Sequence, residues 1–353
     1  MKIAIDVSPL KSSEKKAHSV RGVGSYVLQL SSSLQANFPQ HQYLPFSSSS
    51  EIPSDVDLIH FTYFDPFFIN LPLIKKKKYV VTVHDMIPLL FPNDFPVGKM
   101  GRLRWKLQKK LLQRADHIIT VSKSSREDII KITNLAIDKV SVVYNGVSEI
   151  FGQSTDKKKL ELVKNKYKLP ERFALYVGDA TANKNLPRLV RALGDAQIPL
   201  VLVGKALAMD SFDKENPWNR DLVEIDSFFK KYTNIYRLGF VSEDDLVVIY
   251  KLARVLAMPS LYEGFGLPVL EAMRSGCPVI TSRKGSLPEV GGNAVLYVEP
   301  ESEESILEGI KKVFESDDLY LSLSEKGKKQ SQKFSWDDTA RYTQEVYSKI
   351  YNE

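Results

Sequence analysis

The sequence predicts an α/β protein of two domains, each built around a parallel β-sheet. The chain has 353 residues, and domains usually contain about 100–200 residues. Short apolar runs rich in β-branched residues alternate with longer amphipathic segments, which is the pattern of βα units. This pattern occurs in both halves of the chain, and the polar, lysine-rich stretch Ser148–Pro170 separates them.

In the first half, strands are expected at Lys2–Val7, Asp57–Phe61, Tyr79–His84, His117–Val121 and Val140–Val143. Helices are expected at Ser25–Gln35, Lys99–Arg114 and Ser124–Ile132. Ser122 precedes the last of these helices. A serine in that position can accept a hydrogen bond from a backbone N–H group of the first turn, so Ser122 is the expected N-cap.

In the second half, which begins near Arg172, strands are expected at Phe173–Val177, Leu200–Val203, Ile235–Leu238, Val255–Met258, Val279–Thr281 and Ala294–Val298. Helices are expected at Leu186–Leu193, Ser242–Lys251, Pro268–Ser275 and Ser305–Glu315. The predicted domains are therefore residues 1–165 and 166–335, with a short helix in the linker. A last helix, at 336–353, is expected to pack back on the first domain.

Composition excludes several classes of protein. The single cysteine, Cys277, rules out a disulfide within the chain, and its apolar surroundings are typical of a small buried residue. The first residues do not resemble a signal peptide, and no run reaches the roughly 18 apolar residues of a membrane span. A cytoplasmic protein is therefore expected. The formal charge of +6 favours anionic partners.

Two basic segments could contact such partners. The four lysines of Lys75–Lys78 precede a strand and are typical of a solvated turn. In Lys99–Arg114, basic residues surround an expected apolar stripe of Met100, Leu103, Leu107 and Leu111. Such a helix either packs its stripe on the domain as an ordinary surface helix or lies on an anionic membrane at the inner face.

The segment Pro259–Met273 is the sharpest candidate site. An apolar strand leads into a glycine-rich loop, and the loop leads into a helix. Backbone N–H groups and the positive end of the helix dipole favour an anion there. Gly264 and Gly266 let the backbone approach a ligand closely. Glu263 and Glu271 bracket the loop, and their carboxylates can accept hydrogen bonds from hydroxyl groups.

This segment resembles the Glu-(x)7-Glu signature of retaining glycosyltransferases of the GT-B fold, in particular glycosyltransferase family 4. Other segments agree in the family's order: Gly22–Tyr26, Val81–Pro88, Ala115–Ser122, Val143–Val147, Tyr176–Leu186 and Ser286–Val290. The resemblance covers nearly the whole chain. It implies two Rossmann-like domains with parallel sheets facing across a cleft, and a nucleotide-diphosphate sugar as co-substrate with no further cofactor.

The resemblance also implies roles for the residues that match the family's motifs. Glu271 would bind the ribose hydroxyls, and Glu263 would hold a hydroxyl of the transferred sugar. The backbone of Gly264, Phe265, Gly266 and Leu267 would contact the sugar or diphosphate. Lys184 would neutralise the leaving diphosphate, Gly22 and Gly24 would let a loop close on it, and His84 would lie near the reacting carbon.

The sequence departs from the family at two positions. Asp179 stands where many members carry an arginine after the glycine that corresponds to Gly178, and Asn183 replaces an arginine often found before the lysine. The candidates for the second phosphate-facing cation are Lys205 and Arg237.

No compact acidic cluster argues for a metal ion, and preorganised dipoles with Lys184 could stabilise the leaving group instead. GDP-mannose is the first donor to consider, with UDP- and dTDP-sugars as alternatives. A glycan or lipid-linked molecule is the expected acceptor, and no nucleic-acid motif is present.

Three other functions compete with sugar transfer. A nicotinamide dehydrogenase fits poorly, because Gly22-Val23-Gly24 lacks the third glycine of that fingerprint. A sugar-nucleotide epimerase or phosphorylase shares the fold, and a non-catalytic nucleotide-sugar binding module would explain Asp179. His84-Asp85 could also be a capped strand end, and Asp6 is more simply a loop cap than a catalytic acid.

Overall fold

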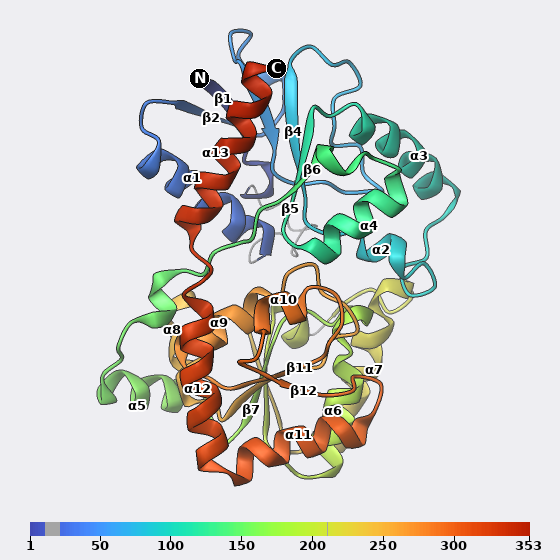
Figure 1. The fold of residues 1–353 in the computed structure, drawn as a ribbon. Coiled ribbons are helices and arrows are strands. Elements are labelled where there is room, and N and C mark those ends of the chain that lie inside the picture. The colour runs from blue at the N-terminus through green and yellow to red at the C-terminus, as the bar shows by residue number, and fades with distance from the viewer. Residues whose placement is uncertain (11–21, 210) are drawn as a thin grey trace. The chain divides into compact units, whose positions relative to one another are not determined.

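The computed structural model describes residues 1–10, 22–209 and 211–353, which form two compact units (Figure 1). Unit 1 contains Met1–Gly146 and Phe334–Glu353, and unit 2 contains Val147–Lys333. Each unit is built around one six-stranded parallel sheet. The α/β class predicted from the sequence is therefore confirmed.

Unit 1 has the strand order β2-β1-β3-β4-β5-β6. The strands are β1 (Lys2–Asp6), β2 (Gln42–Phe46), β3 (Leu58–Phe61), β4 (Lys78–Val83), β5 (His117–Thr120) and β6 (Val140–Val142). The helices are α1 (Gly22–Asn37), α2 (Ile87–Leu90), α3 (Lys99–Gln113), α4 (Lys123–Thr133) and α13 (Trp336–Asn352). Ser122 is the N-cap of α4, because its Oγ accepts a hydrogen bond from Ser125 N at 3.0 Å.

Both faces of this sheet are buried. On β1, Ala4 belongs to one apolar cluster with α3 and α4, whereas Ile3 and Ile5 belong to a second cluster with α1 and α13. Successive side chains of a strand point to opposite faces, so this division places helices on both sides of the sheet. The C-terminal helix α13 contributes Trp336, Tyr347 and other residues to the second cluster, and so completes the core of unit 1.

Unit 2 has the strand order β12-β11-β10-β7-β8-β9. The strands are β7 (Ala174–Val177), β8 (Leu200–Val203), β9 (Ile235–Gly239), β10 (Val255–Met258), β11 (Val279–Thr281) and β12 (Leu296–Tyr297). The helices are α5 (Lys157–Lys166), α6 (Leu186–Asp195), α7 (Arg220–Lys231), α8 (Glu243–Leu252), α9 (Leu267–Ser275), α10 (Leu287–Gly291), α11 (Glu303–Glu315) and α12 (Asp317–Ser331).

Several elements of the structure were not predicted from the sequence. The edge strand β2 was missed because only Phe46 among its five residues is buried and because it contains Pro45, a residue that edge strands tolerate. Helices α7, α10 and α12 were also missed. The buried positions of α12 are Leu323, Gly327 and Ser331, of which only Leu323 gives a hydrophobic signal. The helical periodicity of that segment is therefore weak.

The predicted apolar stripe of α3 is not buried in its first half, so that part of the prediction is wrong. Met100 and Leu103 are 60% and 61% exposed, whereas Leu111 and Leu112 are buried. Gln108 is also fully buried, and its amide donates to the backbone oxygens of Asp65 and Phe68. The buried face of α3 is thus rotated away from the predicted stripe, because a polar side chain with hydrogen-bond partners occupies an interior position.

The boundary between the units also differs from the sequence prediction. Residues 147–165 were assigned to the first domain, but they belong to unit 2. The reason is their attachment to α8. Lys251 donates to Thr155 Oγ1 at 2.7 Å, and directly after α5 Tyr167 donates to Asp245 Oδ2 at 2.9 Å.

Cys277 is 2% exposed, and burial raises the pKa of its thiol to about 12. It is therefore the small buried residue that the sequence predicted. Within the described parts of the chain, every helix is too short or too polar to cross a lipid bilayer.

A buried histidine should make the stability of unit 1 depend on pH. His60 is fully buried, with Nδ1 2.6 Å from Tyr347 Oη and Nε2 2.8 Å from Thr82 Oγ1. Burial lowers the pKa of His60 to about 3, against about 6.5 in an unfolded chain. Between these values the unfolded state binds a proton that the folded state does not, so stability falls as the pH falls.

We expect His60 alone to remove about 2 kcal/mol of stability between pH 7 and pH 5. Urea unfolding at the two pH values measures this loss, followed by tryptophan fluorescence, since Trp105 and Trp336 lie in unit 1. In His60→Gln the difference between the two pH values should shrink by that amount. An unchanged difference would rule out His60 as its source.

Candidate functional site

The segment singled out by the sequence forms a loop and a helix at the carboxyl edge of the unit 2 sheet. Strand β10 ends at Met258, and α9 begins at Leu267. Gly266 lies directly before the helix with φ +96°, a backbone conformation that favours glycine. The first N–H groups of a helix have no partner within it, so this end of α9 attracts negative charge.

Glu263 and Lys184 meet in this loop. The Lys184 ammonium lies 2.8 Å from both carboxylate oxygens of Glu263, and Ser260 Oγ donates to Oε1 at 2.7 Å. Glu263 is 5% exposed, so its charge is balanced largely inside the protein. Lys184 ends the 3-10 turn η6 (Ala182–Lys184), which follows β7. The structure thus brings together two predicted site residues that are distant in the sequence.

The loop is held from two sides. On one side, the side-chain amide of Asn183 donates to Tyr262 O at 3.0 Å, and the backbone carbonyl of Asn183 accepts from Leu261 N at 2.7 Å. On the other side, Ser286 Oγ donates to the carbonyls of Glu263 and Phe265. Asn183, which departs from the family pattern, therefore has a structural role in fixing the loop.

Gly285 shows how closely the neighbouring backbone approaches Glu263. It has φ +57°, and a Cβ at this position would stand 2.6 Å from Glu263 O. Only glycine fits both the conformation and the space. The position of the Glu263 backbone therefore depends on the segment after β11.

Glu271 lies in α9, one turn beyond Gly266. Its Oε2 accepts a hydrogen bond from Tyr250 Oη at 2.9 Å. Tyr250 belongs to α8, is fully buried and contacts the ring of Phe151 edge-on at 5.9 Å. Tyr250 therefore orients the Glu271 carboxylate. Its role could not be predicted from the sequence, because nothing around Tyr250 links it to a residue 21 positions away.

The two candidate second cations have different surroundings. Lys205 is exposed in the 3-10 turn η7 (Lys205–Ala208), which follows β8 at the carboxyl edge of the sheet. The Arg237 guanidinium lies over the ring of Phe229 in α7, 4.1 Å from its centroid. Among the residues that the structure describes, neither cation forms an ion pair like that of Lys184 with Glu263. At the position of the family arginine, the Asp179 carbonyl accepts a hydrogen bond from Tyr176 Oη.

In unit 1, His84 follows the carboxyl end of β4. Its Nε2 lies 3.1 Å from Thr62 O, and its ring meets the ring of Tyr26 edge-on at 4.7 Å. Burial lowers the pKa of His84 to about 4, so its imidazole is neutral at pH 7. A neutral imidazole can exchange hydrogen bonds with hydroxyl groups but does not supply a positive charge.

Gly22 and Gly24 lie in the first turn of α1. Gly24 is buried, whereas Gly22 is exposed. Among the described residues, nothing lies within 4 Å of the place that a Cβ would take at Gly22. Asp6, at the end of β1, accepts a hydrogen bond from Ser8 N at 2.8 Å, which is the loop cap considered from the sequence.

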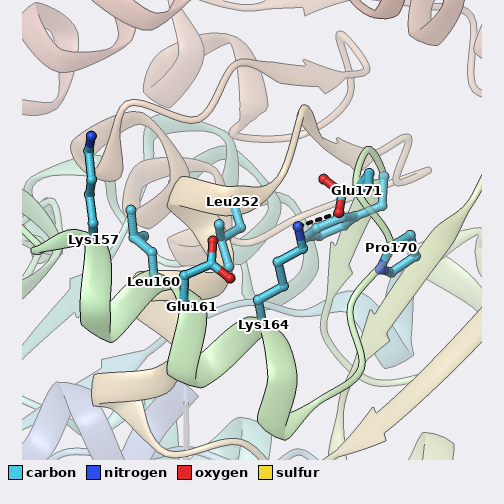
Figure 2. Close-up of a pocket in the computed structure, with 8 residues that line it drawn as sticks. Lys157, Leu160, Glu161, Lys164, Pro170, Glu171 and Leu252 are labelled. Atoms are coloured by element: carbon cyan, nitrogen blue, oxygen red, sulfur yellow. Dashed lines mark hydrogen bonds and ion pairs between the residues drawn. The ribbon is translucent and has the colours of Figure 1, made fainter.

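A cavity of about 320 Å³ in unit 2 lies away from these residues (Figure 2). It is bordered by α5, by Phe173 directly before β7, and by Leu252 at the end of α8. These residues lie at the amino edge of the parallel sheet, whereas the Glu263 loop lies at the carboxyl edge. Figure 2 shows the Lys164–Glu171 ion pair across it, at 2.6 Å. None of the predicted site residues lines this cavity.

Among the residues that the structure describes, no three histidine, cysteine, aspartate or glutamate side chains gather as a metal site requires.

Solved structures share this fold. Sucrose-phosphate synthase from Thermosynechococcus elongatus aligns with a TM-score of 0.75 and 19% identity, over 100% of this chain and 99% of that chain. HepE from Anabaena, solved in complex with UDP-glucose, aligns with a TM-score of 0.75 and 17% identity, over 99% and 100% of the two chains. The fold is that of the GT-B glycosyltransferases.

Sequence comparison identifies the family. A model of glycosyl transferases group 1 matches residues 157–330, and a model of Glycosyltransferase Family 4 matches residues 7–149. O-antigen chain mannosyltransferase B of Escherichia coli is 31% identical over 278 residues, which cover 77% of this chain and 70% of that protein. The chain therefore belongs to glycosyltransferase family 4.

Some relatives are much longer than this chain. The serotype-specific mannosyltransferase WbdA of Escherichia coli is 30% identical over 294 residues, which are 81% of this chain but 35% of that protein. The chain thus matches about a third of the length of such relatives.

Proposed function

We propose that this chain transfers a hexose from a nucleotide-diphosphate sugar to a glycan or lipid-linked acceptor in the synthesis of a cell-surface polysaccharide, with retention of the anomeric configuration. Mannose is the sugar and GDP-mannose the donor that we favour, because relatives in the family carry the names of mannosyltransferases of O-antigen chains. UDP- and dTDP-sugars are the competing donors.

One observation carries the proposal: Lys184 and Glu263 pair at 2.8 Å in the loop that leads into α9. A leaving diphosphate needs positive charge, and Lys184 together with the amino end of α9 supplies it. A transferred sugar needs hydrogen-bond acceptors for its hydroxyls, and Glu263 is such an acceptor. Glu271, oriented by Tyr250, is the acceptor assigned to the ribose hydroxyls.

In the proposed reaction, the bond between the anomeric carbon and the phosphate oxygen breaks, and the acceptor oxygen attacks the same face of the sugar. The acceptor proton passes to the departing phosphate oxygen, so no separate carboxylate base is required. Neutral His84 is assigned a hydrogen bond to a hydroxyl near the reacting carbon, which agrees with the lowered pKa of its imidazole.

The experiment that tests this function combines binding and turnover. GDP, UDP and dTDP are compared for their ability to raise the melting temperature, since a ligand that binds only the folded state stabilises it. The corresponding sugar nucleotides are then incubated with a mannose-terminated acceptor. We expect GDP to stabilise the protein most and GDP-mannose to yield an α-linked product. An epimerised donor without acceptor product would favour the epimerase, and binding without turnover would favour a binding module.

We also propose that the transfer needs no metal ion. Addition of EDTA should leave the rate of the active donor unchanged within about twofold, because Lys184 and the helix dipole supply the charge that a metal would otherwise provide. The control is restoration with Mg²⁺ or Mn²⁺. Loss of activity in EDTA that either ion restores would contradict this part of the proposal.

A further inference from the structure

Two adjoining segments of unit 1 carry exposed apolar side chains. Among the described residues, these two segments contribute six exposed large hydrophobic side chains: Phe68, Ile69, Leu73, Ile74, Met100 and Leu103. Ile74 is 71% exposed and Leu103 is 61% exposed. The first four precede β4, and the last two belong to the first turns of α3. Single exposed apolar residues are ordinary, but a cluster of them indicates a contact surface.

Contacts between side chains and backbone hold the two segments side by side. At one end, the Arg104 guanidinium lies 5.8 Å from the centre of the Phe68 ring, and Gln108 donates to Phe68 O at 2.7 Å. At the other end, Arg114 donates to Leu73 O at 2.9 Å. Arg114 lies ten positions after Arg104, a rise of about 15 Å along a helix axis. The two segments therefore lie beside each other along this length of α3, and together we call them the α3 face (residues 66–78 and 97–114).

The α3 face is strongly basic. Residues 66–78 and 97–114 contain eleven lysines and arginines and no aspartate or glutamate. Since the whole chain carries a formal charge of +6, the rest of the chain carries −5, the difference between +6 and +11. Lys76, Lys99, Arg102, Lys106 and Lys110 are all exposed. The basic character of this protein is therefore concentrated on the α3 face.

We infer that the α3 face binds the surface of an anionic lipid bilayer. Its isoleucine, leucine, methionine and phenylalanine side chains enter the boundary between head groups and acyl chains, while its lysines and arginines bind lipid phosphates. Charge alone would suit a nucleic acid, but the exposed aliphatic side chains have no counterpart on a sugar-phosphate backbone. The inference extends the proposed function, because a lipid-linked acceptor lies at such a surface, but it can be tested without sugar transfer.

The test uses the full chain and sedimentation with lipid vesicles. Vesicles of phosphatidylcholine alone are compared with vesicles in which roughly a third of the lipid is phosphatidylglycerol. We expect binding to the anionic vesicles only, with affinity that falls as salt is added, because salt screens surface charges. Equal binding to both kinds of vesicle, or binding to neither, would overturn the inference.

Two pairs of variants locate the surface. The double variant Lys106→Glu with Lys110→Glu should weaken vesicle binding by about tenfold or more. Its control is Lys157→Glu with Lys158→Glu, which makes the same change of charge on the exposed part of α5 and should leave binding unchanged.

The double variant Phe68→Ser with Leu103→Ser should weaken vesicle binding as well. Its control is Ile137→Ser with Leu321→Ser, which removes similarly exposed side chains from other surfaces and should leave binding unchanged. Equal loss in a variant pair and its control would reject the α3 face.

Other partners give different results. If the α3 face binds a second copy of the chain, wild-type protein will sediment as a dimer in the absence of lipid, and Phe68→Ser with Leu103→Ser will make it a monomer. If it binds nucleic acid, a DNA duplex will bind where vesicles do not. Either result overturns the inference. Transfer to a soluble acceptor by the lysine variants separates loss of membrane binding from failure of the proposed function.

Discussion

Lys184→Ala should lower the rate of sugar transfer by about two to three orders of magnitude, the usual effect of removing one preorganised charge from a reacting oxygen. The diphosphate gains negative charge as the bond to the sugar breaks, and Lys184 is the cation that the structure holds beside Glu263 at the start of α9. The rate is measured under single turnover with saturating donor, so that product release does not mask the chemical step.

Lys184→Ala should also destabilise the fold, and this effect must be distinguished from the loss of catalytic charge. Lys184 also balances the charge of Glu263, which is buried and keeps only the Ser260 hydroxyl among its described hydrogen bonds when the ammonium is removed. An unpaired buried charge costs about 3 kcal/mol or more in stability. Urea unfolding therefore accompanies the rate measurement.

A double variant distinguishes the two effects. Adding Glu263→Gln to Lys184→Ala removes the unpaired charge and should restore stability. If Lys184 acts on the leaving diphosphate, the double variant remains far slower than Glu263→Gln alone. A double variant as fast as Glu263→Gln would show that Lys184 serves only to neutralise Glu263.

Glu271→Ala should raise the dissociation constant of the nucleotide diphosphate by about tenfold to a hundredfold, because hydrogen bonds from ribose hydroxyls to a carboxylate are charge-assisted. The matched variant is Tyr250→Phe, which keeps the ring against Phe151 and removes only the hydroxyl that holds Glu271. It should weaken binding by a smaller factor, and the double variant should be no worse than Glu271→Ala. Isothermal titration with the nucleotide measures both constants.

A deoxyribose nucleotide provides the control for this assignment. If Glu271 binds ribose hydroxyls, the wild type should discriminate against a nucleotide that lacks the 2′-hydroxyl, and Glu271→Ala should lose most of that discrimination. Equal affinity of wild type and Glu271→Ala for the ribonucleotide would remove the assignment.

Much of the fold could be predicted because the signals are local. In unit 2 the strands Leu200–Val203, Val255–Met258 and Val279–Thr281 have the predicted bounds, since each is a short buried run of apolar residues. The partly exposed edge strand at Gln42–Phe46 lacks such a signal. A strand that is buried on both faces can be predicted from its own apolar side chains, whereas an edge strand depends on the neighbouring strand with which it pairs.

At the candidate site too, local sequence predicts the backbone, whereas the contacts between side chains depend on the tertiary structure. The strand that ends at Met258 was predicted with its observed bounds, and the helix after the glycine loop begins at Leu267, one residue before the predicted start, because Gly266 and the apolar residues around it specify that geometry locally. The pairing of Lys184 with Glu263, 79 residues apart, and the support of Glu271 by Tyr250 depend on how the strands are ordered in the sheet. These contacts cannot be predicted from the spacing of residues in the sequence.

By itself, therefore, the sequence determined the α/β class, the family and the chemical type of the residues at the candidate site. Only the tertiary structure decided which side chains meet and which face of a helix is buried. Helix α3 makes the reason plain: its interior position is taken by Gln108, whose amide finds carbonyl partners in the segment before β4, while Met100 and Leu103 remain exposed. Burial depends on the partners that a side chain finds as well as on its own polarity.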